Sequence, residues 1–207
     1  MAKVRQGLET LLSGKFGDKV YVVRDGKNYI RKVPTRKKDS STPAMVISQK
    51  RFSEIMRFCG MFKNSVIPPI WNIAAQGTSG FRLFQKTNSP AFAPDGSLPD
   101  VKKISLSTGK LTLPEGLTAG RPEVDSSIIE VSWLKNLNLG GLHLKDELTV
   151  VSSVDGHYSD ILETGILRGQ LTGSFKLPKL PAPATHIYLF FGSSFHRDYS
   201  ESVCFEI

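Results

Sequence analysis

Short apolar runs that alternate with polar residues fill the second half of the chain, and turn-forming residues separate them. The candidate strands are residues 103–107, 110–113, 128–133, 147–152, 165–177, 186–191 and 202–207. About seven such strands in roughly 107 residues are typical of an antiparallel sandwich. We therefore predict a β-sandwich domain of fibronectin or immunoglobulin type over residues 100–207, with Trp133 packed against its core.

The sequence before this domain predicts a β-hairpin over residues 19–33. Val20–Val23 and Asn28–Val33 are β-type runs that flank a short turn segment. The turn contains Asp25-Gly26, a strong hairpin signal because glycine tolerates positive φ. A sheet of only two strands is marginal in isolation, so we expect this hairpin to pack against something else.

A linker and helices complete the N-terminal half. Residues 34–43 are polar, charged and bounded by prolines, which predicts an extended linker. A helix begins after it and ends before Pro68-Pro69, and a weaker helical pattern covers residues 70–86. The apolar face of the first helix is predicted to contain Phe52, Ile55, Met56, Cys59 and Phe62.

Turn-forming residues crowd the segment 87–100, which we interpret as the boundary between two modules. Residues 1–90 would form a basic module of hairpin, linker and helices, followed by the β-sandwich domain. The predicted fold class is therefore α+β, mainly β.

Positive charge is concentrated at the N-terminus. The chain carries a net charge of +8, and residues 1–50 hold twelve Lys or Arg against four Asp or Glu. The other 157 residues hold fifteen of each sign. Such asymmetry is typical of contact with nucleic acid or with an acidic protein surface. The candidate contact residues are Lys15, Lys19, Arg24, Lys27, Arg31, Lys32, Arg36, Lys37 and Lys38.

Three interpretations of this basic segment are open. It can be an assembly contact, because its apolar residues have no core of their own. It can bind nucleic acid, because cations release counterions on phosphate contact and the interleaved Phe16, Tyr21 and Tyr29 can stack on bases. It can also be a solvated sheet edge, where Lys and Arg prevent unwanted strand pairing.

Motifs that suggest chemistry have simpler explanations. Gly14-Lys15 resembles a phosphate-binding loop, but Glu9 and Phe16 occupy positions that need Gly and Ser or Thr. The segments 155–160 and 196–198 gather His, Asp and Ser side chains, and both favour polar turns. We predict no catalytic, cofactor-binding or metal-binding residue, and therefore no enzyme.

Remaining reactive side chains also favour structural roles. Cys59 and Cys204 lie among apolar neighbours and are predicted to be buried thiols, and His143 and His186 are predicted to be structural. No apolar run approaches the roughly 18–20 residues that span a bilayer, so no membrane contact is expected. The lack of a signal-peptide pattern predicts synthesis in the cytoplasm.

Several short motifs resemble one family. Ser13, Gly14, Lys15, Gly17, Gly26, Ile30, Arg31 and Pro34 fit the pattern SGK-x-G-(strand)-G-x-x-x-(I/V)-R-x-x-P. Further matches are Gly80–Phe84 with Asn88, SLSTGKL at 105–111, SW at 132–133, HIYLFFGS at 186–193 and YSESV at 199–203. The chain thereby resembles a family of proteins of unknown function from Bacteroides-group bacteria and their phages or prophages.

The resemblance implies an N-terminal module, a sandwich domain and no known catalytic activity. Genes of this family frequently occur together with phage genes, which favours a virion component. We therefore expect a non-enzymatic structural protein that forms a homo-oligomer or binds other virion proteins, at a head–tail junction, ring or tail position. The alternative is a nucleic-acid-binding protein that uses the same basic segment.

Overall fold

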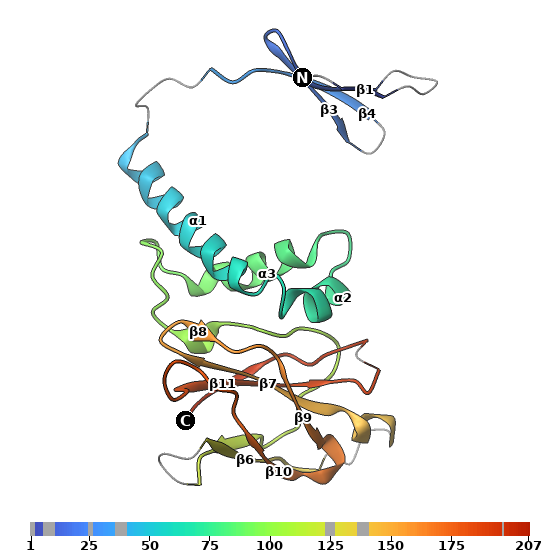
Figure 1. Cartoon of the computed structure of the whole chain (residues 1–207), viewed down its shortest axis with the longest axis vertical. Coiled ribbons are helices and arrows are strands. Elements are labelled where there is room, and N and C mark those ends of the chain that lie inside the picture. The colour runs from blue at the N-terminus through green and yellow to red at the C-terminus, as the bar shows by residue number, and fades with distance from the viewer. Residues whose placement is uncertain are drawn as a thin grey trace. The chain divides into compact units, whose positions relative to one another are not determined.

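The computed structural model describes residues 3–5, 11–24, 27–35, 41–122, 127–135, 141–195 and 197–207. The chain divides into an N-terminal unit, Met1–Thr42, and a C-terminal unit, Pro43–Ile207. Figure 1 shows strands in the first unit and both helices and strands in the second. The fold is α+β, and every pairing between its named strands is antiparallel.

The N-terminal unit is a four-stranded sheet in the order β1-β2-β3-β4. Its strands are β1 (Lys3–Arg5), β2 (Leu11–Phe16), β3 (Lys19–Arg24) and β4 (Lys27–Lys32). Strands β3 and β4 pair from Lys19 opposite Lys32 to Arg24 opposite Lys27, which confirms the predicted hairpin. Its turn residues, Asp25 and Gly26, lie outside the described residues. The sequence does not predict β2, because LLSGKF contains a glycine and lacks clear alternation.

Two adjacent strands form the centre of the C-terminal unit. Strand β7 (Glu147–Val154) pairs with β11 (His186–Gly192) from Ser153 opposite His186 to Glu147 opposite Gly192. Every residue of the pair is buried except the first of each strand. Continuous apolar runs such as IYLFF in β11 are typical of strands that are covered on both faces.

The sheet around this pair has five strands. Its order is β12-β11-β7-β8, and β9 also pairs with β7. The outer strands are β8 (His157–Tyr158), β9 (Leu162–Leu167) and β12 (Val203–Glu206).

Helices cover one face of the five-stranded sheet (Figure 1). They are the α-helices α1 (Pro43–Met61), α2 (Asn72–Ala74) and α3 (Gly80–Asn88). Three short helical segments accompany them: the π-helix η1 (Ile67–Trp71) and the 3-10 helices η2 (Ser89–Ala91) and η3 (Val101–Lys103). One buried cluster joins Phe58, Trp71 and Phe84 of these elements to Tyr188 of β11. The indole N–H of Trp71 donates to the carbonyl oxygen of Leu106 at 2.9 Å, so the buried ring keeps its hydrogen bond.

A second sheet shares a core with the opposite face. Its order is β10-β6-β5, formed by β10 (Thr172–Lys176), β6 (Ile128–Ser132) and β5 (Thr118–Gly120). Trp133, which is 5% exposed, packs edge-on against Phe191 with ring centroids 5.2 Å apart. This confirms the predicted core position of Trp133. Two further 3-10 helices adjoin strands: η4 (Gly141–Lys145) precedes β7, and η5 (Arg168–Gln170) follows β9.

The strand predictions hold where the runs are long and apolar. The predicted segments 128–133, 147–152, 186–191 and 202–207 correspond to β6, β7, β11 and β12. The predicted run 165–177 is two strands, because η5 and the left-handed Leu171 (φ 65°) interrupt it. The predictions of strands at 103–107 and 110–113 are wrong. Side-chain hydrogen bonds hold this segment instead: the hydroxyl of Ser107 donates to Ser200 and that of Ser202 accepts from Leu106.

Helix α1 agrees with the predicted helix, but its buried face differs. Ile55, Phe58 and Cys59 are buried, whereas Phe52 is 54% exposed. The prediction for Phe52 is wrong because at this level the helix turns Arg51 toward the rest of the unit, where its guanidinium donates to the carbonyl oxygens of Ser89 and Phe92. The predicted helix 70–86 is interrupted between α2 and α3.

The division of the chain also lies elsewhere than predicted. The predicted boundary segment 87–100 contains Asn88 and Phe92, which are 0% and 6% exposed in the C-terminal unit. Asn88 receives a hydrogen bond from the backbone of Ser105 and donates one back. The helices therefore belong to the same unit as the C-terminal strands, and the units meet in sequence at Thr42 and Pro43.

We predict opposite effects for two helical glycines. A Cβ at Gly80 would lie 2.5 Å from the backbone nitrogen of Asn72, whereas one at Gly60 would meet nothing within 4 Å. Gly80→Ala should lower the free energy of unfolding by about 1–3 kcal/mol through overpacking. Gly60→Ala should leave it unchanged or raise it by up to about 1 kcal/mol. Urea denaturation measures both, and equal effects would contradict the close contact at Gly80.

Candidate functional site

The strand register sorts the side chains of the N-terminal sheet onto two faces. Residues paired across strands share a face, and successive residues in a strand point to opposite faces. The Tyr29 face comprises Lys15, Val20, Val22, Lys27, Tyr29 and Arg31. The Ile30 face comprises Phe16, Lys19, Tyr21, Val23, Asn28, Ile30 and Lys32.

The Tyr29 face is basic around an aromatic centre. Lys27, Tyr29 and Arg31 are alternate residues of the edge strand β4, and all residues of this strand are exposed. Lys15 and Arg31 both lie opposite Val20, on either side of it. Three cations therefore surround an exposed Tyr29 and its apolar neighbour Val22.

The Ile30 face is apolar with cations at one end. Phe16 and Ile30 are 73% and 60% exposed, and Tyr21, opposite Ile30, is partly buried. Lys19 lies directly opposite Lys32, a like-charge pairing that destabilises a sheet. The face thus combines uncovered apolar surface with unfavourable charge repulsion.

The predicted contact residues do not form one patch. Lys15, Lys27 and Arg31 lie on the Tyr29 face, whereas Lys19 and Lys32 lie on the Ile30 face. Arg24 is placed only by its backbone pairing with Lys27. The predicted residues Arg36, Lys37 and Lys38 lie outside the described residues.

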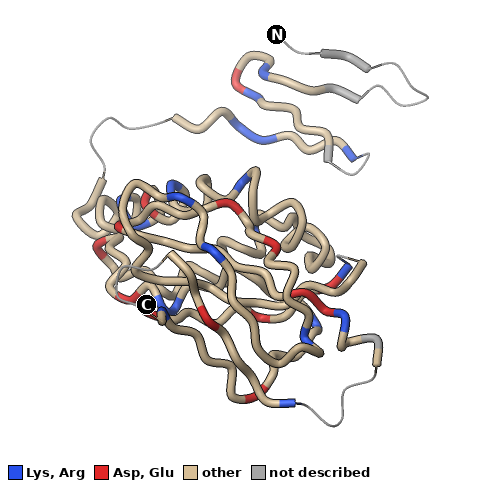
Figure 2. The backbone as a smooth tube through the Cα atoms, turned by 60° about the horizontal axis from the view of Figure 1, so that its bottom comes forward, with Lys and Arg blue, Asp and Glu red and all other residues tan. Residues whose placement is uncertain are grey.

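The described cations therefore lie on two surfaces, because neighbours such as Arg31 and Lys32 point to opposite faces. The charge asymmetry itself is visible in Figure 2, where Lys and Arg dominate the described part of the N-terminal unit. In the C-terminal unit the two signs are interspersed.

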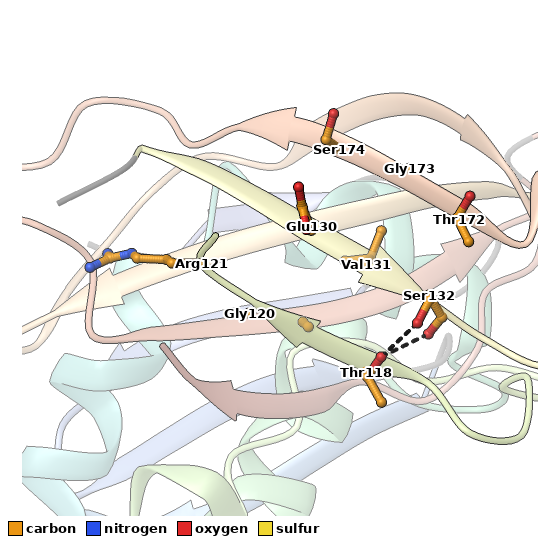
Figure 3. Close-up of a pocket in the computed structure, with 10 residues that line it drawn as sticks. Thr118, Gly120, Arg121, Glu130, Val131, Ser132, Thr172, Gly173 and Ser174 are labelled. Atoms are coloured by element: carbon orange, nitrogen blue, oxygen red, sulfur yellow. Dashed lines mark hydrogen bonds between the residues drawn. The ribbon is translucent and has the colours of Figure 1, made fainter. Parts of the chain in front are cut away.

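A hollow that the sequence does not signal lies on the outer side of the β10-β6-β5 sheet (Figure 3). It has a volume of about 650 Å³ and is lined mainly by small polar side chains. Thr118 and Thr172 flank Ser132 across the three strands, and the hydroxyls of Thr118 and Ser132 are 2.8 Å apart. A Cβ at Gly120 would meet nothing within 4 Å, so this position leaves the hollow open.

The hollow offers hydrogen bonds to a polar ligand. Its hydroxyls both donate and accept, and Glu130 lies in the next row between Gly120 and Ser174. Arg121 points away from the other labelled side chains in Figure 3 and donates to the carbonyl oxygen of Ala184 at 2.5 Å. These residues are distant in sequence and meet only because the strands pair, which explains why sequence reasoning missed them.

The sequence also does not predict a buried ion pair that the structure contains. Asp146 and Arg168 are 2% and 4% exposed, and Arg168 Nε lies 3.7 Å from Asp146 Oδ2. Arg168 also donates to the carbonyl oxygen of Thr112 at 2.7 Å and lies over the ring of Phe191. Nδ1 of His143 lies 3.2 Å from the same carboxylate oxygen.

The cluster around Asp146 has a structural role. Burial raises the pKa of the Asp146 carboxyl, while the charge of Arg168 and the hydrogen bond from His143 act in the opposite direction. The adjoining cavity, lined in part by Arg168, has a volume of only about 10 Å³, which is too small for a ligand. Arg168 instead ties the segment at Thr112 to the start of β7.

The first polar segment considered for catalysis, residues 155–160, begins with a turn, as predicted. Asp155 and Gly156 both have positive φ, 47° and 77°, and form the two-residue turn between β7 and β8. Tyr158 packs against Phe62 with ring centroids 4.9 Å apart, and Ser159 donates to the backbone of Asp160. His196 of the second segment lies outside the described residues.

The two cysteines are free thiols. Cys59 is fully buried, as predicted, and burial raises its pKa to about 11. Cys204 is only partly buried, and burial again raises the pKa of its thiol. A thiol with a raised pKa is rarely ionised at neutral pH and is a poor nucleophile.

Neither a cluster of metal-binding side chains nor a membrane-spanning helix occurs in the described part of the chain. No group of three or more His, Cys, Asp or Glu side chains gathers closely enough to hold a metal ion. No described helix has the length and apolar character needed to cross a bilayer.

Comparison with protein-family models, with curated proteins and with solved structures gives no match for this chain. The resemblance of its short motifs to the Bacteroides-group and prophage family therefore stays a prediction. Function has to be argued from the geometry of the two units.

Removing one partner of the buried ion pair should lower the free energy of unfolding more than replacing both partners. Arg168→Met leaves Asp146 buried without its ionic partner, and we expect a loss of about 3–5 kcal/mol in the free energy of unfolding. Adding Asp146→Asn removes the uncompensated charge, so the double variant should recover part of this loss. Urea denaturation of the four chains in a double-mutant cycle measures the coupling, and strictly additive losses would contradict a direct interaction.

Proposed function

We propose that this protein is a non-enzymatic structural protein that assembles through its N-terminal sheet. One observation carries the proposal: none of the described side chains at 13–23 and 27–35 is buried. The apolar face of a sheet has to be buried against another element to contribute to stability in water. The Ile30 face, with Phe16 73% and Ile30 60% exposed, supplies the surface that a partner would cover.

The chemistry of this face suits a second copy of the chain or another subunit. Its centre is apolar, with Tyr21 beside Ile30, and its cations Lys19 and Lys32 lie at one end. Apolar centres with charged rims are the usual composition of protein interfaces. An uncovered apolar face also rarely persists on a soluble monomer.

A second exposed apolar surface supports assembly independently. The side chains of Met45, Val46, Ile47 and Phe52 in the first half of α1 are 47–54% exposed. Because this half of α1 extends beyond the rest of the C-terminal unit, a neighbouring subunit has access to it (Figure 1).

The proposed setting is a phage particle, at a head–tail junction, a ring or a tail. The motif resemblance supports this setting. The proposed body is a fibronectin-like or immunoglobulin-like sandwich. The core that two antiparallel sheets share around Trp133 supports such a body.

Polar substitutions on the Ile30 face should weaken self-association. Burying one large apolar side chain contributes about 1.5–3 kcal/mol, so Phe16→Thr with Ile30→Thr should weaken the oligomer by tenfold or more. Threonine retains a high strand propensity and spares the sheet. Sedimentation velocity over a range of concentrations measures the change, and Val22→Thr on the other face is the matched control with a small effect.

The same experiment can overturn the proposal. If the wild-type chain is strictly monomeric at all concentrations, the proposed self-assembly is contradicted. If mass spectrometry then also failed to find the protein in purified phage particles, the virion role would be lost as well.

A further inference from the structure

The edge strand of the N-terminal sheet presents a cation, an aromatic ring and a second cation in a row. Lys27, Tyr29 and Arg31 are alternate exposed residues of β4 on the Tyr29 face. Same-face neighbours in a strand are about 6.6–6.8 Å apart. Tyr29 is 53% exposed, so its ring is available to a ligand between two positive charges.

A third cation completes this arrangement. Lys15 and Arg31 lie on opposite sides of Val20, two strand spacings or roughly 10 Å apart. Val22 lies opposite Tyr29 in the next row, so Val20 and Val22 form an apolar floor between the charges. The Tyr29 face thus has an aromatic and aliphatic centre with three cations around it.

These charges are not neutralised within the described part of the N-terminal unit. The carboxylate described there is that of Asp18, which lies in the turn between β2 and β3 rather than on a strand. Among the described residues, Lys15, Lys27 and Arg31 form no ion pair. The Tyr29 face therefore carries a positive charge that attracts an anionic ligand.

We propose that the Tyr29 face binds single-stranded nucleic acid. A base would stack on Tyr29, and Lys15, Lys27 and Arg31 would contact the flanking phosphates. Sequence-tolerant binding of single strands uses this combination, a basic surface that follows the backbone and aromatic rings on which bases stack. A duplex keeps its bases stacked inside, so they are not available to stack on Tyr29. An acidic peptide would pair with the cations but would make no use of the aromatic ring. Single-stranded nucleic acid uses both features.

This inference goes beyond the proposed assembly role and does not depend on it. Assembly is assigned to the Ile30 face, on the other side of the same sheet. A substitution on the Tyr29 face can therefore remove nucleic-acid binding while the oligomeric state stays unchanged. Sedimentation velocity of each variant therefore distinguishes a loss of self-association from a loss of nucleic-acid binding.

Neighbouring cations on opposite faces give a matched pair for the test. The probe is a fluorescently labelled oligo-dT, and fluorescence anisotropy at several salt concentrations measures its binding to the full-length chain. Arg31→Gln and Lys32→Gln change the net charge equally. We expect Arg31→Gln to raise Kd at least fivefold and to reduce the slope of log K against log salt by about 0.7. Lys32→Gln should change Kd less than twofold.

The ring is tested separately from the charge. Tyr29→Ala should weaken oligo-dT binding at least fivefold through loss of stacking, whereas Tyr29→Phe should retain binding within twofold. Circular dichroism checks that both variants fold.

Several outcomes would overturn the proposal. These are no binding of oligo-dT at low salt, equal weakening by Arg31→Gln and Lys32→Gln, or no effect of Tyr29→Ala. Competition by polyglutamate or by duplex DNA as effective as that by oligo-dT would also overturn it. The first competitor would indicate an acidic protein partner, and the second would indicate charge-driven duplex binding.

Discussion

The pairing of β7 with β11 is the contact on which the rest of the C-terminal unit depends. Alternate residues of these strands point to opposite faces, so Tyr188 and Phe190 meet the helices while Ile187 and Leu189 meet the second sheet. Each layer therefore covers apolar surface that would otherwise face water. The helices are part of this core, which is why the unit begins at Pro43 rather than near residue 100.

The N-terminal unit has the same antiparallel pairing but, among its described residues, no second layer of its own. No described side chain of β3 or β4 is buried, and the register places Lys19 opposite Lys32. Backbone hydrogen bonds alone contribute little net stability, because the unfolded chain forms them with water. The contrast between the two units is the physical basis for assigning partner contacts to the first and a structural body to the second.

Much of the fold was predictable where one local rule dominated. The Asp25-Gly26 signal located the β3–β4 hairpin, and the 3.6-residue apolar spacing located α1. Predictions failed where tertiary contacts replaced local ones. Residues 103–107 have a strand-like sequence, but the hydrogen bonds that Leu106 and Ser107 donate to Ser202 and Ser200 hold this segment in irregular structure. For the candidate site, the sequence identified the basic residues and their aromatic neighbours, but not the faces on which they lie.

The sequence by itself determined the β3–β4 hairpin, helix α1, the long apolar strands β7 and β11, the core position of Trp133 and the concentration of positive charge before residue 50, because these follow from local patterns and composition. Only the tertiary structure decided which side chains share a surface. Alternation within β4 already separates Tyr29 and Arg31 from Ile30 and Lys32, but only strand register places Lys15 of β2 on the Tyr29 face. Register and layer contacts join residues that are distant in sequence, so no local pattern encodes them.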